Sequence, residues 1–208
     1  MAAKSPVFIF LFFLQLFAYS EGKIERTIRA GNVDELRQIL KNGVLVNEPV
    51  TSNGETIAMI AAEGSTPDVV QVAIDYGADL HLRDKLGRTA LHHAAYYGMT
   101  KNIDLLLRNG VSVNSSLPYE FTVLMQAALN GKADSVQFLV AHGADVNAQD
   151  GSGNTALIHS VWGNNPLTVK TLLDAGADPS IRNKDNETAL DIANGNKTVD
   201  IINLLESR

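Results

Sequence analysis

Apolar, small and polar positions along the chain follow a pattern that returns every 33 residues. Its clearest marker is a threonine, found at Thr56, Thr89, Thr122, Thr155 and Thr188. Two apolar residues follow each threonine, and an alanine or serine stands five positions after it. A fixed period of this length is typical of proteins in which each unit buries its apolar face against the next. The pattern therefore predicts a stack of similar units.

Each unit is predicted to contain a polar turn, a short helix, a second turn and a second helix that ends at a glycine. The second helices carry apolar clusters that one unit alone could not bury: "IDLLL" at 103–107, "VQFLV" at 136–140 and "VKTLL" at 169–173. The glycines that follow fit helix C-caps, where a left-handed backbone favours glycine; they are Gly77, Gly110, Gly143 and Gly176. We therefore expect an all-α solenoid of about six stacked helix-turn-helix units, with short turns and no sheet core.

Several short stretches carry a more specific signal: "GRTALH" at 87–92, "AA" at 94–95 and "GADVNAQD" at 143–150. They closely resemble the ankyrin repeat. Alanine stands at positions 90, 156 and 189, where the ankyrin pattern usually has proline. The resemblance extends from Lys23 to Arg208, and it implies a module that binds other proteins.

The resembling region, taken as one domain over residues 21–208, divides into six units. Unit 1 (23–52) departs most from the pattern, and unit 6 (184–208) is shortened. Units 2 to 5 are fuller and span 53–84, 85–117, 118–150 and 151–183. The two end units look like the caps that a repeat stack needs for solubility.

Residues 1–20 differ in kind from the repeats. A single positive charge at Lys4 precedes the apolar run "PVFIFLFFLQLFAY", and small residues, Ala18 and Ser20, follow at the spacing of a cleavage site. This order is typical of a secretory signal peptide, and the run is shorter than the roughly 20 apolar residues of a membrane-spanning helix. We predict cleavage after Ser20, with Gly22 as the second choice, and a secreted protein. The alternative is an uncleaved segment that tethers an intracellular adaptor to a membrane.

Three Asn-x-Ser/Thr triplets would matter in a eukaryotic secretory pathway. They begin at Asn114, Asn186 and Asn196, all in predicted turns or at helix ends. We therefore expect these asparagines to be accessible to glycosylation.

Charge and composition narrow the classes of partner and chemistry. The formal net charge of −6 argues against nucleic acid, because phosphate binding needs a clustered cationic surface. The chain has no cysteine, which excludes disulfides, thiolate metal sites and a cysteine nucleophile. No glycine-rich phosphate loop or paired-carboxylate pattern occurs. We expect no cofactor, no membrane contact once the chain is processed, and a monomer.

The adjacent pair His92 and His93 is the strongest candidate for chemistry. The resemblance gives His92 a structural role, in which its ring bonds the turn backbone. No His, Asp or Glu lies three or four residues from either histidine, so one helix face cannot supply a metal site. No nearby residue would orient a catalytic base. The sequence therefore predicts neither a metal site nor an enzyme.

The resemblance places a protein-binding surface on the concave side of the middle units. Aromatic and arginine residues are the usual hot spots of protein interfaces. The candidate residues are Arg83, Lys85, Arg88, His93, Tyr96, Tyr97, Tyr119, Phe121, Gln126 and Trp162. The basic ones would steer an acidic patch of the partner. Two alternatives stay open: the aromatic residues fill gaps between irregular units, and the basic loop is merely solvated.

Overall fold

The computed structural model describes residues 22–64 and 66–207, so the predicted signal peptide lies outside the described residues. Six pairs of helices follow one another. The first pair is a helix at 22–29 with α2 (Val33–Lys41), and the second is α3 (Ile57–Gly64) with α4 (Pro67–Asp75). The others are α5 (Ala90–Tyr97) with α6 (Thr100–Arg108), α7 (Val123–Leu129) with α8 (Ala133–Ala141), α9 (Ala156–Trp162) with α10 (Pro166–Asp174), and α11 (Ala189–Asn196) with α12 (Val199–Glu206).

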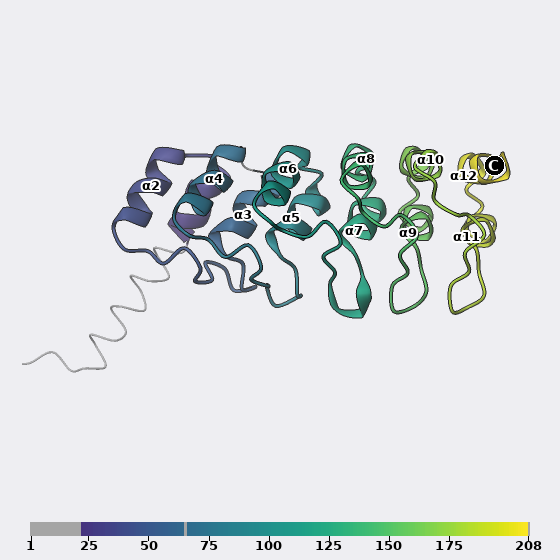
Figure 1. Ribbon diagram of the computed structural model, residues 1–208, viewed down its shortest axis with the longest axis horizontal. Helices are drawn as coiled ribbons and strands as arrows, with labels where there is room; N and C mark the ends of the chain where they lie inside the picture. The colour runs from purple at the N-terminus through teal and green to yellow at the C-terminus, as the bar shows by residue number, and fades with distance from the viewer. Residues whose placement is uncertain (1–21, 65, 208) are drawn as a thin grey trace, which may run out of the picture.

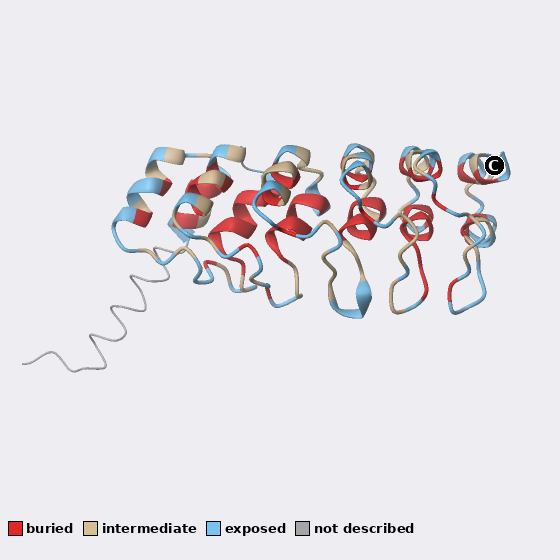
Figure 2. Ribbon diagram, viewed as in Figure 1, coloured by how far each residue is buried: buried red, intermediate tan, exposed pale blue. Residues whose placement is uncertain are grey.

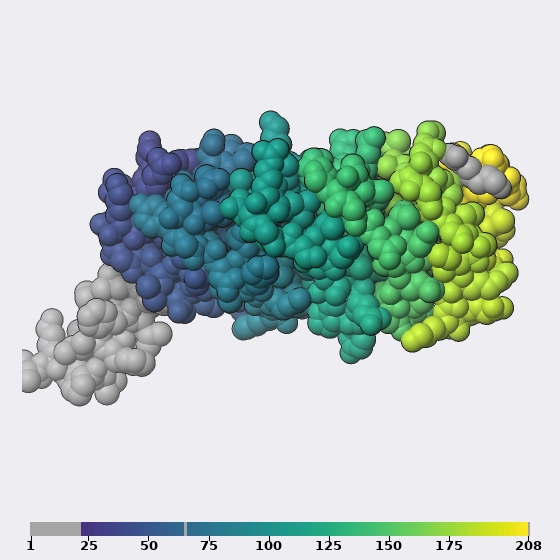
Figure 3. Space-filling view, in the orientation of Figure 1, coloured from purple at the N-terminus to yellow at the C-terminus, as the bar shows by residue number. Residues whose placement is uncertain are grey.

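The pairs stand side by side in a row (Figure 1). Helices α3, α5, α7, α9 and α11 form an inner row, in which each helix contacts the next. Helices α4, α6, α8, α10 and α12 form a second row, and long loops project from the side opposite to it. Successive units appear as adjacent bands of one elongated surface (Figure 3). The predicted all-α solenoid of about six stacked units is confirmed.

The recurring threonine starts the inner helices. The hydroxyl oxygens of Thr122, Thr155 and Thr188 each accept a hydrogen bond from the backbone N–H three residues later. This contact satisfies one of the donors that every helix start leaves unpaired. The glycines after the second helices have φ between 83° and 88°, as predicted for left-handed C-caps; they are Gly77, Gly110, Gly143 and Gly176.

The core lies between the two rows of helices, as the buried inner faces in Figure 2 show. The small residue five positions after each threonine is fully buried: Ala61, Ala94, Ala127, Ser160 and Ala193. Small side chains let neighbouring inner helices approach closely. The apolar clusters of the second helices cover them, with Ile103, Leu106, Val136, Leu139, Val169 and Leu172 also fully buried. Among the described residues, strand pairing is limited to one antiparallel bridge between Ser116 and Thr122.

Candidate functional site

Four aromatic side chains of units 3 to 5 are exposed on the stack. Tyr96 and Tyr97 end α5, with exposed fractions of 39 % and 42 %, and their rings meet edge to face at a centroid distance of 5.0 Å. Trp162 ends α9 and is 44 % exposed. Tyr119 is 86 % exposed, in a short 3-10 turn, η1 (Pro118–Glu120). We call these four residues the aromatic surface.

Two hollows flank Tyr97. One, of about 580 Å³, is lined by polar residues and by five charged side chains, those of Glu25, Arg29, Glu55, Glu63 and Arg88. The other, of about 240 Å³, lies over units 3 to 5 and is lined in part by Lys132, Asp134 and Leu167. Tyr97 therefore stands between a charged hollow and a mixed one, and both are open to a partner's side chains.

Phe121 belongs to a second group of rings. Its ring meets the ring of His159 edge to face at 4.8 Å, and His159 meets Trp162 in the same way at 5.2 Å. We call Phe121, His159 and Trp162 the ring cluster. It joins the loop before α7 to helix α9. Phe121 is partly buried, so the gap-filling alternative describes Phe121 better than the four residues of the aromatic surface.

Two predicted partner-binding residues are buried. His93 is fully buried and Gln126 is 8 % exposed. Both stand four positions after the repeat threonine, on the face of the inner helix that packs against the neighbouring unit. The prediction that these two residues contact a partner is therefore wrong for this conformation.

His93 instead lies between two carboxylates. Its Nδ1 is 3.0 Å from Oε1 of Glu63, and its Nε2 is 3.1 Å from Oδ2 of Asp84. A neutral imidazole has one N–H, so making both hydrogen bonds requires a second proton in the cluster. The residues come from units 2 and 3, and the contacts therefore connect the two units.

Two arginines extend this arrangement into a charged network. Arg29 contacts Oε2 of Glu63 at 2.5 Å and Oε1 of Glu25 at 2.9 Å. Arg88 contacts Oδ2 of Asp84 at 2.7 Å and Oε1 of Glu55 at 3.4 Å. The network links units 1, 2 and 3.

Burial and hydrogen bonding act in opposite directions on the network's carboxylates. Burial alone would raise the pKa of Glu63, but hydrogen bonds from His93 and Arg29 outweigh it and lower that pKa. Burial likewise opposes ionisation of Asp84, whose pKa is lowered by the backbone and side-chain N–H groups of Arg88. Both groups are therefore ionised at neutral pH.

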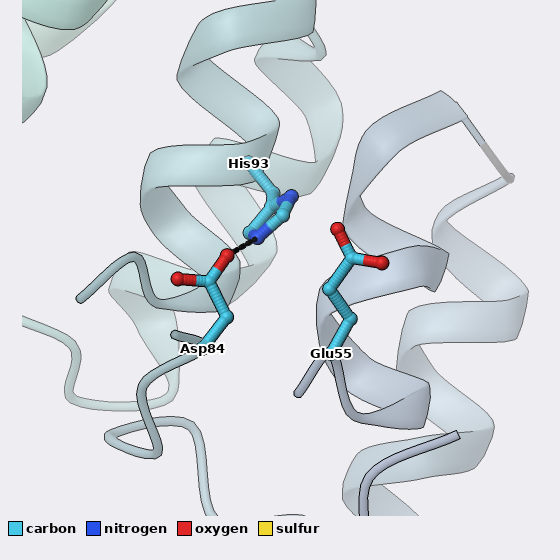
Figure 4. Close-up of side chains that lie close together, drawn as sticks. All are labelled: Glu55, Asp84 and His93. Atoms are coloured by element: carbon cyan, nitrogen blue, oxygen red, sulfur yellow. Dashed lines mark hydrogen bonds and ion pairs between the residues drawn. The ribbon is translucent and has the colours of Figure 1, made fainter. Parts of the chain in front are cut away.

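Glu55, Asp84 and His93 also have the donor types of a metal site (Figure 4). Their potential ligand atoms all lie within 4.8 Å of one another. The sequence argument against a metal considered a single helix and missed this set, which two units bring together. The guanidinium of Arg88, however, already contacts both carboxylates. The absence of a metal stays a prediction.

The predicted basic loop is largely engaged within the protein. Arg88 pairs with Asp84 and Glu55 as described above. Arg83 donates to the carbonyl oxygens of Gly87 and Ser116, at 2.7 and 3.0 Å, and so connects the loop before α5 to the loop before α7. Arg83 and Lys85 are exposed. The loop therefore presents less free positive charge than its sequence suggests.

His92 has the structural role that the sequence predicts. The ring is fully buried, and its Nδ1 lies 3.3 Å from the backbone nitrogen and 2.9 Å from the hydroxyl oxygen of Thr89. These contacts cap the start of α5. Burial lowers the pKa of His92 to about 3.

The three predicted glycosylation sites differ in what their side chains do. The amide of Asn114, which is also exposed, donates to the carbonyl oxygen of Gly143 at 3.3 Å and accepts from the backbone N–H of Asp145 at 3.0 Å, which ties unit 3 to unit 4. Asn186, at a loop tip with φ of 64°, and Asn196, at the end of α11, are exposed.

Comparison with known proteins agrees with this architecture. The family model described as "Ankyrin repeats (3 copies)" matches residues 25–117 and 124–207, well over half of the 208 residues. The chain belongs to the ankyrin-repeat family. A crystal structure of an ankyrin repeat domain from Acinetobacter baumannii superimposes with a TM-score of 0.73 at 27% identity, covering 89% of this chain and 96% of that one.

Relatives among curated proteins match part of this ankyrin-repeat protein. The inactive serine/threonine-protein kinase TEX14 of Bos taurus is 36% identical over 90 residues, which are 43% of this chain and 6% of that protein. Ankyrin repeat domain-containing protein 37 of Mus musculus is 34% identical over 80 residues, which are 38% of this chain and 50% of that protein. The matches thus span half or less of these two relatives. None of the helices within 22–64 and 66–207 has the length and apolar character of a membrane span.

Sequence reasoning did not identify the partners of the two histidine contacts, among them Glu63, Asp84 and Asp150, nor His159 itself. The available signal was an Asp followed nine residues later by a His, which occurs at Asp84 and His93 and again at Asp150 and His159. At both places the two side chains are hydrogen-bonded.

Proposed function

We propose that this ankyrin-repeat protein binds a protein partner on the concave side of units 3 to 5, without catalysis. Ankyrin repeats generally mediate contacts between proteins, and the fold is generally non-catalytic. The observation that carries the proposal is the aromatic surface, four large side chains that stay exposed on neighbouring units. Exposed aromatic side chains of this kind are frequent binding hot spots.

The hollows beside Tyr97 support the same location. An anchor residue works best beside a concavity that a partner's side chain can fill. Tyr97 lines both the charged and the mixed hollow, and Leu167, which is also exposed, lines the second. Arg83 and Lys85 remain exposed in the neighbouring loop and would attract an acidic patch of the partner.

Truncating the aromatic surface should weaken partner binding while leaving the fold intact. We expect Trp162→Ala and Tyr96→Ala each to cost at least about 2 kcal/mol of binding, roughly a 30-fold loss of affinity. Tyr119 has φ of 62°, so Tyr119→Asn removes its ring with a residue that tolerates this backbone. The measurement is partner capture from the native source, with melting temperatures of all variants.

Leu45→Ala and Val199→Ala are matched controls, because both residues are exposed and lie in the end units. They should leave capture unchanged. Aromatic variants that bind like the parent, or that melt much earlier, would show that the rings have a packing role instead.

We propose further that the protein is secreted after removal of residues 1–20. The order of charge, apolar run and small residues in this segment supports the proposal. N-terminal sequencing of protein from its native host should find Glu21 as the first residue. Asn114, Asn186 and Asn196 would then carry glycans, seen as a mass decrease on deglycosylation. An intact N-terminus in the cytosol, or a full-length chain that needs detergent, would favour the tethered adaptor.

A further inference from the structure

The ring cluster and the charged network occupy equivalent places in two repeats. His159 follows His93 by two repeat lengths, and Asp150 follows Asp84 by the same interval. In both units the histidine Nε2 lies near Oδ2 of the aspartate, at 2.8 Å for His159 and 3.1 Å for His93. The backbone turn around the aspartate is also the same, because Oδ1 of each accepts the N–H groups two and four residues later.

The residues around the two histidines differ completely in charge. The position of Glu55 is taken by Phe121, that of Glu63 by Leu129, and that of Arg88 by Asn154. Three charged side chains beside His93 thus become one aromatic, one aliphatic and one amide side chain beside His159.

The first consequence is a free acceptor. Nδ1 of His159 has no hydrogen-bond partner, although the residue is 95% buried, whereas Nδ1 of His93 has Glu63. Since Nε2 of His159 lies against the carboxylate of Asp150, the proton of a neutral ring sits on Nε2 and Nδ1 keeps its lone pair. Burial lowers the pKa of His159 despite Asp150, so the ring is neutral at neutral pH.

The second consequence is an unbalanced charge. Asp150 accepts hydrogen bonds from Ser152, Asn154 and His159, and in the described part of the chain it forms no ion pair with Lys or Arg. Asp84, by contrast, has Arg88. A carboxylate whose side chain is only 10% exposed, without a basic partner and close to the exposed ring of Trp162, favours a cation.

We propose that unit 5 receives a basic side chain of the partner, an arginine, at the ring cluster. Its guanidinium N–H donates to Nδ1 of His159, and its plane stacks on the ring of Trp162 within the field of Asp150. Arginine suits this position because it combines several fixed donors with a planar face that stacks on aromatic rings. This inference rests on the proposed function and adds the chemistry of the partner.

In this proposal Trp162 covers the position. Nδ1 of His159 is shielded from solvent, and the Trp162 ring packs edge to face on the His159 ring at 5.2 Å, so the incoming guanidinium would displace the indole ring. Trp162 is the last residue of α9 and is 44 % exposed, which lets its side chain move without unwinding the helix. It is also the single tryptophan of the chain, and its indole signal therefore reports occupancy directly.

A partner carboxylate, as found beside His93, would have the opposite pH dependence. It would require a second proton on His159 and would bind more tightly as the pH falls. Arginine requires the neutral ring and is lost as His159 becomes protonated. Asp150 is the charged group that acts on His159 among the described residues. Phe121 and Leu129 stand where Glu55 and Glu63 stand beside His93, and Ile192 is the residue of unit 6 at the repeat position of His159. None of these three side chains titrates.

The test is NMR titration of residues 21–208 with N-acetyl-arginine amide. We expect saturable shifts of the Trp162 indole N–H and the His159 ring signals, which disappear as the pH falls through the titration of His159. The neutral N-acetyl-citrulline amide should have little effect. Equal shifts with citrulline, no shift with arginine, or a response to N-acetyl-glutamate amide that strengthens in acid would each overturn the proposal.

Two variants test the geometry itself. His159→Ile introduces the residue that units 2 and 6 have at this position, Ile60 and Ile192. It should weaken the arginine response at least about tenfold, the factor for losing a hydrogen bond to a charged group. Leu129→Glu should recreate the contact between Glu63 and His93, raise the pH at which His159 titrates and abolish the response. Leu129→Gln is its uncharged control.

The inference and the proposed function can fail separately. If Trp162→Ala reduces partner capture but arginine amide causes no shifts, the arginine site is wrong and the binding surface stands. If arginine amide binds as expected while Trp162→Ala leaves partner capture unchanged, the site exists and the proposed partner surface is wrong.

Discussion

Asp84→Ala is expected to lower the free energy of unfolding by about 3–5 kcal/mol, the range for removing one partner of a buried ion pair. Oδ1 of Asp84 accepts the backbone N–H groups of Leu86 and Arg88, both at 2.8 Å. Its Oδ2 accepts from Arg88 Nε at 2.7 Å and lies 3.1 Å from Nε2 of His93. Alanine would leave all four groups without this acceptor, and the buried His93 would retain Glu63 alone. Urea denaturation at neutral pH measures the loss.

Two substitutions serve as controls for Asp84→Ala. Asp84→Asn keeps the acceptor for the turn, as Asn183 does at the equivalent position at the end of unit 5, and removes only the charge. Its loss should be smaller. Asp178→Ala removes an aspartate that bonds Ser180 in an exposed turn, and it should hardly change the denaturation midpoint. An Asp84→Ala protein as stable as the parent would show that the network contributes nothing to folding.

Acidification from pH 7 to about pH 4.5 is expected to cost about 2.5 kcal/mol of stability through His92 alone. The pKa of His92 is about 3 in the folded protein, because burial opposes the charged ring. In the unfolded chain it is about 6.5. The unfolded state therefore takes up the proton first as the pH falls, and protonation favours unfolding. The contribution is complete above the unfolded value and is lost as the pH falls toward the folded one.

His92→Met isolates this contribution. Methionine is the chain's own residue at the equivalent positions of units 2 and 4, where Met59 and Met125 place their sulfur 3.4 and 3.3 Å from the threonine backbone nitrogen. The variant should keep the helix cap and lose about 2.5 kcal/mol less than the parent over the same pH interval. The comparison uses urea denaturation at both pH values. Equal losses in the two proteins would show that His92 does not control acid stability.

Protonation of the carboxylates destabilises the fold at lower pH than protonation of His92. The residues concerned are Glu63, Asp84 and Asp150. Their folded pKa values lie below those of the unfolded chain, so the stability that they contribute is present above the unfolded values and is lost as the pH falls through the folded ones. Free carboxyl groups titrate near pH 4. The loss of stability between pH 7 and about pH 4.5 therefore comes mainly from histidine.

The sequence alone determined the repeat architecture of this protein. Thr122, Thr155 and Thr188 each cap their own helix three residues away, and the glycines after the second helices end them where the backbone is left-handed. These are contacts within one unit, so short-range rules predict them. The need of each apolar cluster for a neighbouring unit then predicts the stack. The structural role of His92 followed from the resemblance to the ankyrin repeat.

Only the tertiary structure decided which side chains meet between units. Glu63 meets His93 and Phe121 meets His159 because stacking places the end of one inner helix, or the loop before it, beside the next inner helix. One repeated position therefore carries a buried charged network in unit 3 and a ring cluster in unit 5. The repeat pattern of the sequence is identical at the two positions. The burial, the ion pairs and the unpaired nitrogen of His159 depend on which side chains the adjacent unit places beside each histidine.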